Sequence, residues 1–122
     1  MNTSEDIIRA LRRVRVPAQP GEYDIHGAIA EALAAAEIAF IHEYPLGPRR
    51  RVDFLCGKIA IEVKKGRPQP AALIRQLTRY LESGAVDEII VVTQKRVTIP
   101  ETIRGKRVQA VSLNANWGLA LP

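Results

Sequence analysis

The chain has 122 residues, 47% hydrophobic and 25% charged, which is typical of one globular domain and excludes disordered, collagen-like and disulfide-rich classes. Cys56 is the single cysteine, and no apolar run approaches the ~20 residues of a membrane helix, so we expect a cytoplasmic protein without an internal disulfide or a membrane span. The net charge of +5 is local, because the segment from Gly47 to Arg67 holds seven of the 18 basic residues and two of the 13 acidic ones. Such a segment favours a polyanionic partner, most often nucleic acid, with a solvated loop as the alternative.

The first 20 residues predict a basic arm ahead of a single domain over residues 21–122. Ser4 is a candidate helix cap, Ile7 and Leu11 belong to a small apolar face, and Pro17 and Pro20 break the chain. We expect this arm either to pack on a partner subunit or to be mobile.

The rest of the sequence predicts a helix over 24–37 with Asp24 as its cap, strands over 38–46, 51–56 and 59–65, a helix over 71–83, and strands over 87–93 and 107–113. Gly57 and Lys58 form a two-residue hairpin turn between the second and third strands. The strand that follows the second helix is expected to run parallel to the third strand. The order indicates an α/β domain with a mixed central sheet flanked by helices.

Three ionisable residues, Asp53, Glu62 and Lys64, fall on the predicted hairpin. Strand alternation places Glu62 and Lys64 on one face, and the two-residue turn places Asp53 across from Glu62, with Val52 and Phe54 together on the opposite face. Two facing carboxylates repel each other unless a cation lies between them, so the pattern predicts a Mg²⁺ site beside a lysine. Three ordinary surface residues are the alternative, but ionisable groups on so apolar a strand are costly outside a cleft.

The segments Arg51-Val-Asp53-Phe and Ile61-Glu62-Val-Lys64 together resemble the signature of the PD-(D/E)XK nuclease superfamily. In that signature an acidic residue on one strand precedes (D/E)-x-K on the next; Val52 stands where the family has proline. The resemblance implies a restriction-endonuclease-like fold with an αβββαβ core. The segment Gln76-Leu-Thr-Arg-Tyr80 resembles the Q-x-x-x-Y element of RecB-type nuclease domains, with the Gln76 amide near a metal-bound water or a phosphate and Tyr80 in the core.

The resemblance implies a DNA endonuclease that uses Mg²⁺, with Mn²⁺ as an alternative ion. Asp53, Glu62 and the Val63 carbonyl would hold the metal, and Lys64 would orient water or stabilise developing charge. The family often adds one glutamate on the first helix. We favour Glu22 for that role on its shared face with Ile25 and Ile29, and we keep Glu31 and Glu43 as alternatives. His26 and His42 show no ligand spacing and are expected as packed or surface residues.

The basic residues expected to grip the nucleic-acid backbone are Arg49, Arg50, Arg51, Lys65 and Arg67. Aromatic residues make up 5% of the chain and no base-reading element is evident, which favours a structure-selective nuclease for branched or junction DNA. A chain of this size presents two active sites to a duplex only as a homodimer. The alternatives are a non-catalytic nucleic-acid-binding or assembly subunit of the same fold, and a nuclease acting on RNA.

Overall fold

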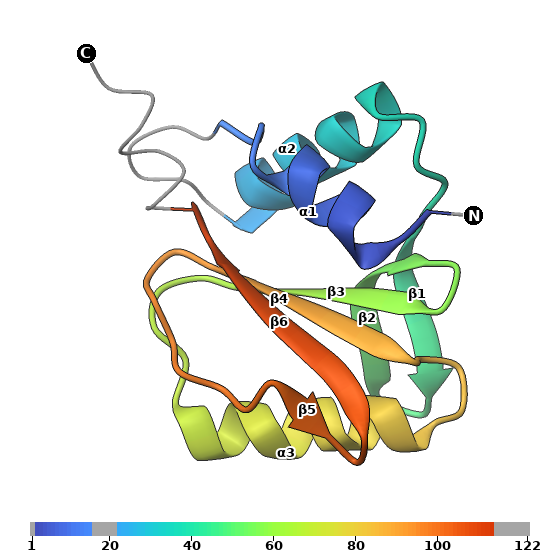
Figure 1. The fold of residues 1–122 in the computed structure, drawn as a ribbon, viewed down its shortest axis with the longest axis vertical. Helices are drawn as coiled ribbons and strands as arrows, with labels where there is room; N and C mark the ends of the chain where they lie inside the picture. The colour runs from blue at the N-terminus through green and yellow to red at the C-terminus, as the bar shows by residue number, and fades with distance from the viewer. Residues whose placement is uncertain (1, 16–21, 114–122) are drawn as a thin grey trace.

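The computed structural model describes residues 2–15 and 22–113. Within these ranges the chain forms an α/β fold in which a six-stranded mixed sheet separates α1 and α2 on one face from α3 on the other (Figure 1). The elements are α1 (Ser4–Leu11), α2 (Glu22–Ala35), β1 (Ile41–Gly47), β2 (Arg50–Cys56), β3 (Ile59–Lys64), α3 (Pro70–Glu82), β4 (Glu88–Thr93), β5 (Thr102–Ile103) and β6 (Lys106–Ser112).

The sheet order is β1-β2-β3-β4-β6-β5. β1, β2 and β3 form an antiparallel meander and β4 runs parallel to β3, both as the sequence predicts. β6 runs parallel to β4, a direction for which the sequence made no prediction. Gly57 adopts a φ of 63° in the turn between β2 and β3, which a glycine tolerates without strain. The sequence did not predict β5, because two residues paired with the start of β6 carry no periodic signal.

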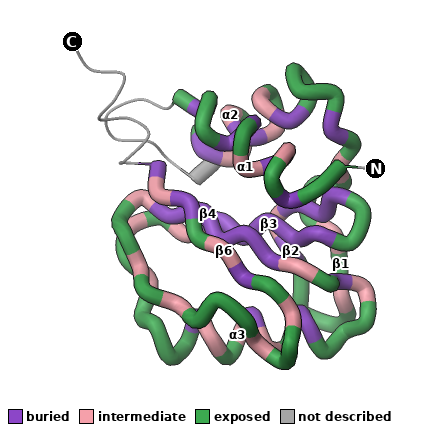
Figure 2. The backbone as a smooth tube through the Cα atoms, in the orientation of Figure 1, coloured by how far each residue is buried: buried purple, intermediate pink, exposed green. Residues whose placement is uncertain are grey.

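Two apolar clusters cover the two faces of the sheet. Phe54, Ile61 and Val92 pack against α1 and α2, whereas Ala60 and Val91 pack against α3. The central strands are therefore buried on both faces, while β1, at one edge, is mostly exposed (Figure 2). Burial raises the pKa of the Cys56 thiol to about 11, so this cysteine is a packing residue.

Helix α1 belongs to the domain core, which corrects the expectation of a peripheral arm for residues 4–14. Ile7 and Leu11 are fully buried in the cluster formed with α2 and the sheet. Each such side chain contributes about 1.5–3 kcal/mol through burial. The N-cap of α1 is Thr3, whose side chain accepts a hydrogen bond from the Asp6 amide in a capping box. Ser4 is therefore the first helical residue and not the cap. The prolines of the expected linker lie outside the described residues.

Two other helix starts differ from the predicted ones by one or two residues. α2 begins at Glu22, which places Asp24 inside the helix and not at its cap. α3 begins at Pro70, and the side chain of Gln69 caps it by accepting from the Ala72 amide. Proline suits this position because a first-turn N–H has no partner within the helix.

The face pattern of β2 changes at Asp53, which corrects the expectation that Val52 and Phe54 share a face. Phe54 packs on the α1–α2 side and Val52 on the α3 side. The partner strand changes as well: His42 pairs with Phe54 and Tyr44 with Val52, and Glu43 between them has a φ of 56°. The two strands twist together at this point, so the rest of the β1–β2 hairpin diverges from β3.

Candidate active site

Asp53 lies where β2 separates from β3. The ladder between the two strands ends at Phe54 and Ile61, in the register that the two-residue turn predicts. One residue further on, the Asp53 carboxylate replaces a main-chain partner, because its Oδ2 accepts from the Val63 amide at 2.7 Å. This hydrogen bond holds Asp53 where the two strands separate, with 23% of its side chain exposed.

Glu62 is the one charged residue that is buried among the described residues, at 4% exposure. Its Oε2 lies 3.2 Å from the Lys64 Nζ, which confirms that the two side chains share a face. Its Oε1 is buried without a well-formed hydrogen bond to any described residue. Burial, and next the negative charge of Asp53, raise the pKa of Glu62 to about 7, while Lys64 opposes the shift.

A buried carboxylate with an unsatisfied oxygen, opposed by a second carboxylate, is a costly arrangement for the protein alone. A hard divalent cation would satisfy the oxygen and remove the repulsion, so the donor set fits Mg²⁺. No group of three or more histidine, cysteine, aspartate or glutamate side chains suited to a metal occurs in residues 2–15 and 22–113. Asp53, Glu62 and the Val63 carbonyl would therefore share the ion with water or substrate oxygens, as Mg²⁺ sites usually do.

The α3 face of the site is formed by Gln76 and Tyr80. The Gln76 Nε2 donates to the Tyr80 hydroxyl at 2.8 Å, and that hydroxyl donates to the Arg51 carbonyl at 2.9 Å. Burial, followed by the negative charges of Glu62 and Asp53, raises the pKa of Tyr80 above its ordinary value. Tyr80 is a core residue, as expected, and the Gln76 amide nitrogen is engaged in orienting it.

His26, which the sequence predicts only as a packed or surface residue, also reaches the site. His26 on α2 places its Nε2 3.9 Å from the Asp53 Oδ2, and its Nδ1 lies 2.8 Å from the Nε2 of His42 on β1. The His26 Nε2 is buried without a hydrogen bond to any described residue and is the ring nitrogen that lies near the Asp53 carboxylate. The two histidines are 16 positions apart, on a helix and a strand, so no spacing rule connects them.

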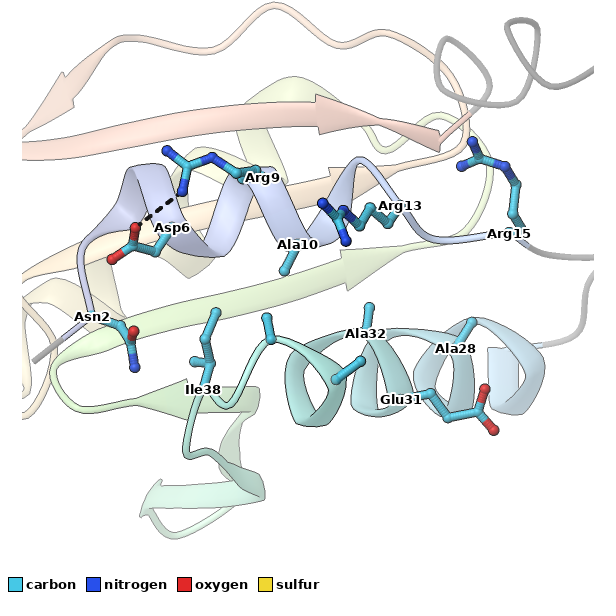
Figure 3. A pocket seen from close by; sticks show the side chains of 12 residues that line it. Asn2, Asp6, Arg9, Ala10, Arg13, Arg15, Ala28, Glu31, Ala32 and Ile38 are labelled. Atoms are coloured by element: carbon cyan, nitrogen blue, oxygen red, sulfur yellow. Dashed lines mark hydrogen bonds and ion pairs between the residues drawn. The ribbon is translucent and has the colours of Figure 1, made fainter.

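The three glutamates proposed as an additional acid have different positions. Glu22 starts α2, but its side chain lies outside the described part of the structure. Glu31 is exposed in the groove of about 600 Å³ between α1 and α2, which Asp53, Glu62 and Lys64 do not line (Figure 3). Glu43 is exposed on β1 in the left-handed conformation described above.

The structure divides the basic segment. One exposed group lies at the tip of the β1–β2 hairpin and the start of β2, and it consists of Arg49, Arg50 and Arg51. A second exposed group lies in the loop after β3 and consists of Lys65 and Arg67. These two groups stand on the two arms that diverge at Asp53. Lys58, by contrast, lies at the other end of β3, 3.6 Å from Asp87.

Protein-family models, curated proteins and solved structures were all compared with the chain, and none matches it. Among the described residues, no helix has the length and apolar character that crossing a bilayer requires.

Proposed function

We propose that the protein is a Mg²⁺-dependent endonuclease that hydrolyses phosphodiester bonds in DNA, with the restriction-endonuclease-like fold that the sequence motif implies. The observation that carries this proposal is Glu62, which is buried, has an unsatisfied oxygen, faces Asp53 and is 3.2 Å from Lys64. A protein without chemistry at this point has no physical need for so costly a group.

Asp53, Glu62 and the Val63 carbonyl are assigned to hold Mg²⁺, with Mn²⁺ as a substitute. When bound, the ion polarises the phosphodiester and makes water a stronger nucleophile at neutral pH. The hydrogen bond from the Val63 amide holds Asp53 in place before substrate arrives. His26 faces the same carboxylate and Gln76 orients Tyr80 beneath it, so both are assigned to positioning.

Lys64 is assigned to the reacting phosphate. Its side chain is 28% exposed at the end of β3, which leaves the ammonium accessible to substrate while Glu62 restrains it. A compact cation in this position stabilises the negative charge that develops on the phosphate oxygens. The exposed bases Arg49, Arg50, Arg51, Lys65 and Arg67 are assigned to the nucleic-acid backbone, and a homodimer would bring two such sites to one duplex.

A substrate panel tests the proposal. The full chain is incubated with plasmid, linear duplex, single-stranded DNA, a four-way junction and RNA, each with Mg²⁺ and with EDTA. We expect Mg²⁺-dependent cleavage of DNA, with junction DNA preferred if the nuclease is structure-selective.

The matched variants are Asp53→Ala and Glu62→Ala, with Asp87→Ala as the control, because Asp87 is an exposed carboxylate at the far end of β3. Cleavage should be abolished in the first two and kept in the control, and calorimetry should show weaker Mg²⁺ binding only in the first two. Unchanged Mg²⁺ affinity in both site variants would contradict the assignment.

A further inference from the structure

The strand ends opposite the turn at Gly57 carry a second polar cluster. Lys64, Thr93 and Ser112 pair in register across β3, β4 and β6, and we call this end of the parallel strands the carboxyl edge. In Figure 1 it is the left end of the sheet, where the chain leaves β3 and β4. Ligands of open α/β sheets bind outside the carboxyl ends of the strands.

A pocket of about 280 Å³ opens at this edge, and Arg12, Thr93, Arg96 and Ser112 supply its polar lining. Thr93 is one of the few buried polar residues, and its hydroxyl donates to the Lys95 carbonyl at 2.6 Å, which shapes the loop that presents Arg96. Arg12 reaches the pocket from the end of α1. Two arginines from separate elements thus line one small space together with Thr93 and Ser112.

Lys64 at this edge pairs with Glu62, whereas the other basic residues here have no ion-pair partner within residues 2–15 and 22–113. No described carboxylate forms an ion pair with Arg12, Lys65, Arg67, Lys95 or Arg96. At the opposite end of the same strands, which we call the amino edge, each basic residue is paired: Lys58 and Lys106 with Asp87, Arg104 with Glu82, and Arg107 with Glu5. The protein therefore balances positive charge at the amino edge and leaves it available for an external anion at the carboxyl edge.

A hydrogen bond connects the pocket to the candidate active site. Gln94, the residue after Thr93, accepts from the Gly66 amide at 2.8 Å through its Oε1. The loop that follows Lys64 and the loop that carries Arg96 are thereby held together. Neighbouring strands lie about 4.8 Å apart, so β3 and β6 are separated by about 10 Å. Successive phosphates of one strand are further apart in space than the axial rise of about 3.4 Å, so that separation spans fewer than three nucleotides.

We propose that Arg12, Arg96 and Ser112, beside the loop that Thr93 holds in place, form a phosphate-binding subsite for the nucleic-acid strand that enters the active site. The subsite holds a backbone phosphate about one or two nucleotides from the bond that is cut. It rests on the proposed nuclease function and adds a register to it: the substrate strand follows the carboxyl edge from Lys64 past Gln94 to Arg96. Arginine suits this role because its planar fork matches two phosphate oxygens.

The test uses the double variant Arg12→Ala/Arg96→Ala in the full chain, with Arg75→Ala/Arg79→Ala on the exposed side of α3 as a control of equal charge loss. Binding of a labelled DNA strand is measured by anisotropy in EDTA over a range of salt concentrations. We expect the subsite variant to bind about tenfold more weakly. Its plot of log K against log salt should be shallower by about 0.7, the change expected when one phosphate of a single strand is no longer neutralised. The control should keep the wild-type slope.

Position is tested with DNA strands that carry one neutral methylphosphonate linkage, moved stepwise away from the cleavage site. Wild-type binding should drop when the neutral linkage is about one or two nucleotides from the cut, and the subsite variant should be insensitive at that position. A parallel series in inorganic phosphate, at constant ionic strength, distinguishes a strand site from a site for the free anion. Loss of the difference between wild type and variant in phosphate, without a positional effect, would overturn the strand assignment.

The remaining outcomes separate the two proposals. If the chain cleaves DNA but Arg12→Ala/Arg96→Ala behaves as Arg75→Ala/Arg79→Ala does, the subsite is refuted and the nuclease proposal stands. If the wild-type chain neither binds nor cleaves nucleic acid, the nuclease proposal is refuted and the subsite with it. Circular dichroism of both variants checks folding, and Arg12→Gln/Arg96→Gln repeats the test with polar side chains of intermediate length.

Discussion

Lys106 and Lys64 lie at opposite ends of the parallel strands and are similarly exposed, at 32% and 28% of their side chains. The Lys106 ammonium donates to the Leu81 and Val86 carbonyls and lies 3.4 Å from Asp87, so its charge and hydrogen bonds are satisfied by the protein. The Lys64 ammonium forms an ion pair with one oxygen of the Glu62 carboxylate. The other oxygen of that carboxylate has no well-formed hydrogen bond among the described residues. Lys106 is thus bonded within the protein, and the different surroundings of Lys64 support the role proposed for it at the phosphate.

The largest difference between the two lysines is expected when each is replaced with alanine in turn. Lys64→Ala should lower single-turnover cleavage about 100-fold or more while largely keeping Mg²⁺ binding, because its proposed role is in the transition state. Lys106→Ala should keep cleavage and lose about 1–3 kcal/mol of unfolding free energy, because two carbonyls lose their donor. Quenched-flow assays and urea unfolding separate the two losses. Full activity in Lys64→Ala would refute the site.

A second prediction concerns the dependence of stability on pH. The pKa of Glu62 rises from 4.5 to about 7 on folding, so the folded protein binds the extra proton between these values. Without metal, the free energy of unfolding should therefore fall as pH rises from about 4.5 to about 7, by up to about 3 kcal/mol at about 1.4 kcal/mol per unit.

Urea unfolding at a series of pH values checks this expectation. Glu62→Gln should remove most of the fall, and Mg²⁺ should reduce it in the wild type because a bound cation favours the ionised carboxylate. Glu31→Gln, which removes an exposed carboxylate on α2, is the matched control and should keep the wild-type curve. If the stability of Glu62→Gln depended on pH as that of the wild type does, the raised pKa of Glu62 would not be the cause of the fall.

A smaller effect is expected at His26. His26→Ala should weaken Mg²⁺ binding and cleavage about tenfold, because the residue faces the carboxylate that is assigned to the metal. His42 contacts His26 and lies behind it as seen from the Asp53 carboxylate, so His42→Ala should have a smaller effect in the same direction. Calorimetric titration with Mg²⁺ measures both independently of cleavage. Equal affinities in the two variants and the wild type would show that the histidine pair only packs against Phe54.

The smallest change in chemistry is expected from the hairpin arginines. Replacing Arg49, Arg50 and Arg51 with alanine should make the plot of log K against log salt on a DNA duplex shallower by about 0.9 for each phosphate that the variant no longer neutralises. Single-turnover cleavage at saturating protein should change little, since none of the three is assigned to the reacting phosphate. Wild-type affinity and slope in the triple variant would show that this end of the hairpin is only a solvated surface.

Short-range sequence rules predicted that Glu62 and Lys64 lie on one face of β3. A two-residue turn fixes the register of β2 against β3, and the period of two then puts Glu62 and Lys64 on one face. The same rules failed one residue further on. The alternation reverses at Asp53, since its side chain bonds the Val63 amide and the hairpin twists away, and no periodic pattern encodes that change.

Sequence patterns predict the order of the main elements, the mixed sheet and two carboxylates near a lysine, because these follow from the hairpin turn, strand alternation and the crossover rule for parallel strands. The packing of α1 in the core, the approach of His26 to Asp53 and the shared pocket of Arg12 and Arg96 appear only in the folded structure. It also decided which basic residues have carboxylate partners, and Lys58 is neutralised by Asp87 although it belongs to the most basic segment of the chain. These contacts join residues far apart in the chain, and their geometry depends on how the helices and strands pack as whole elements, which short-range patterns do not specify.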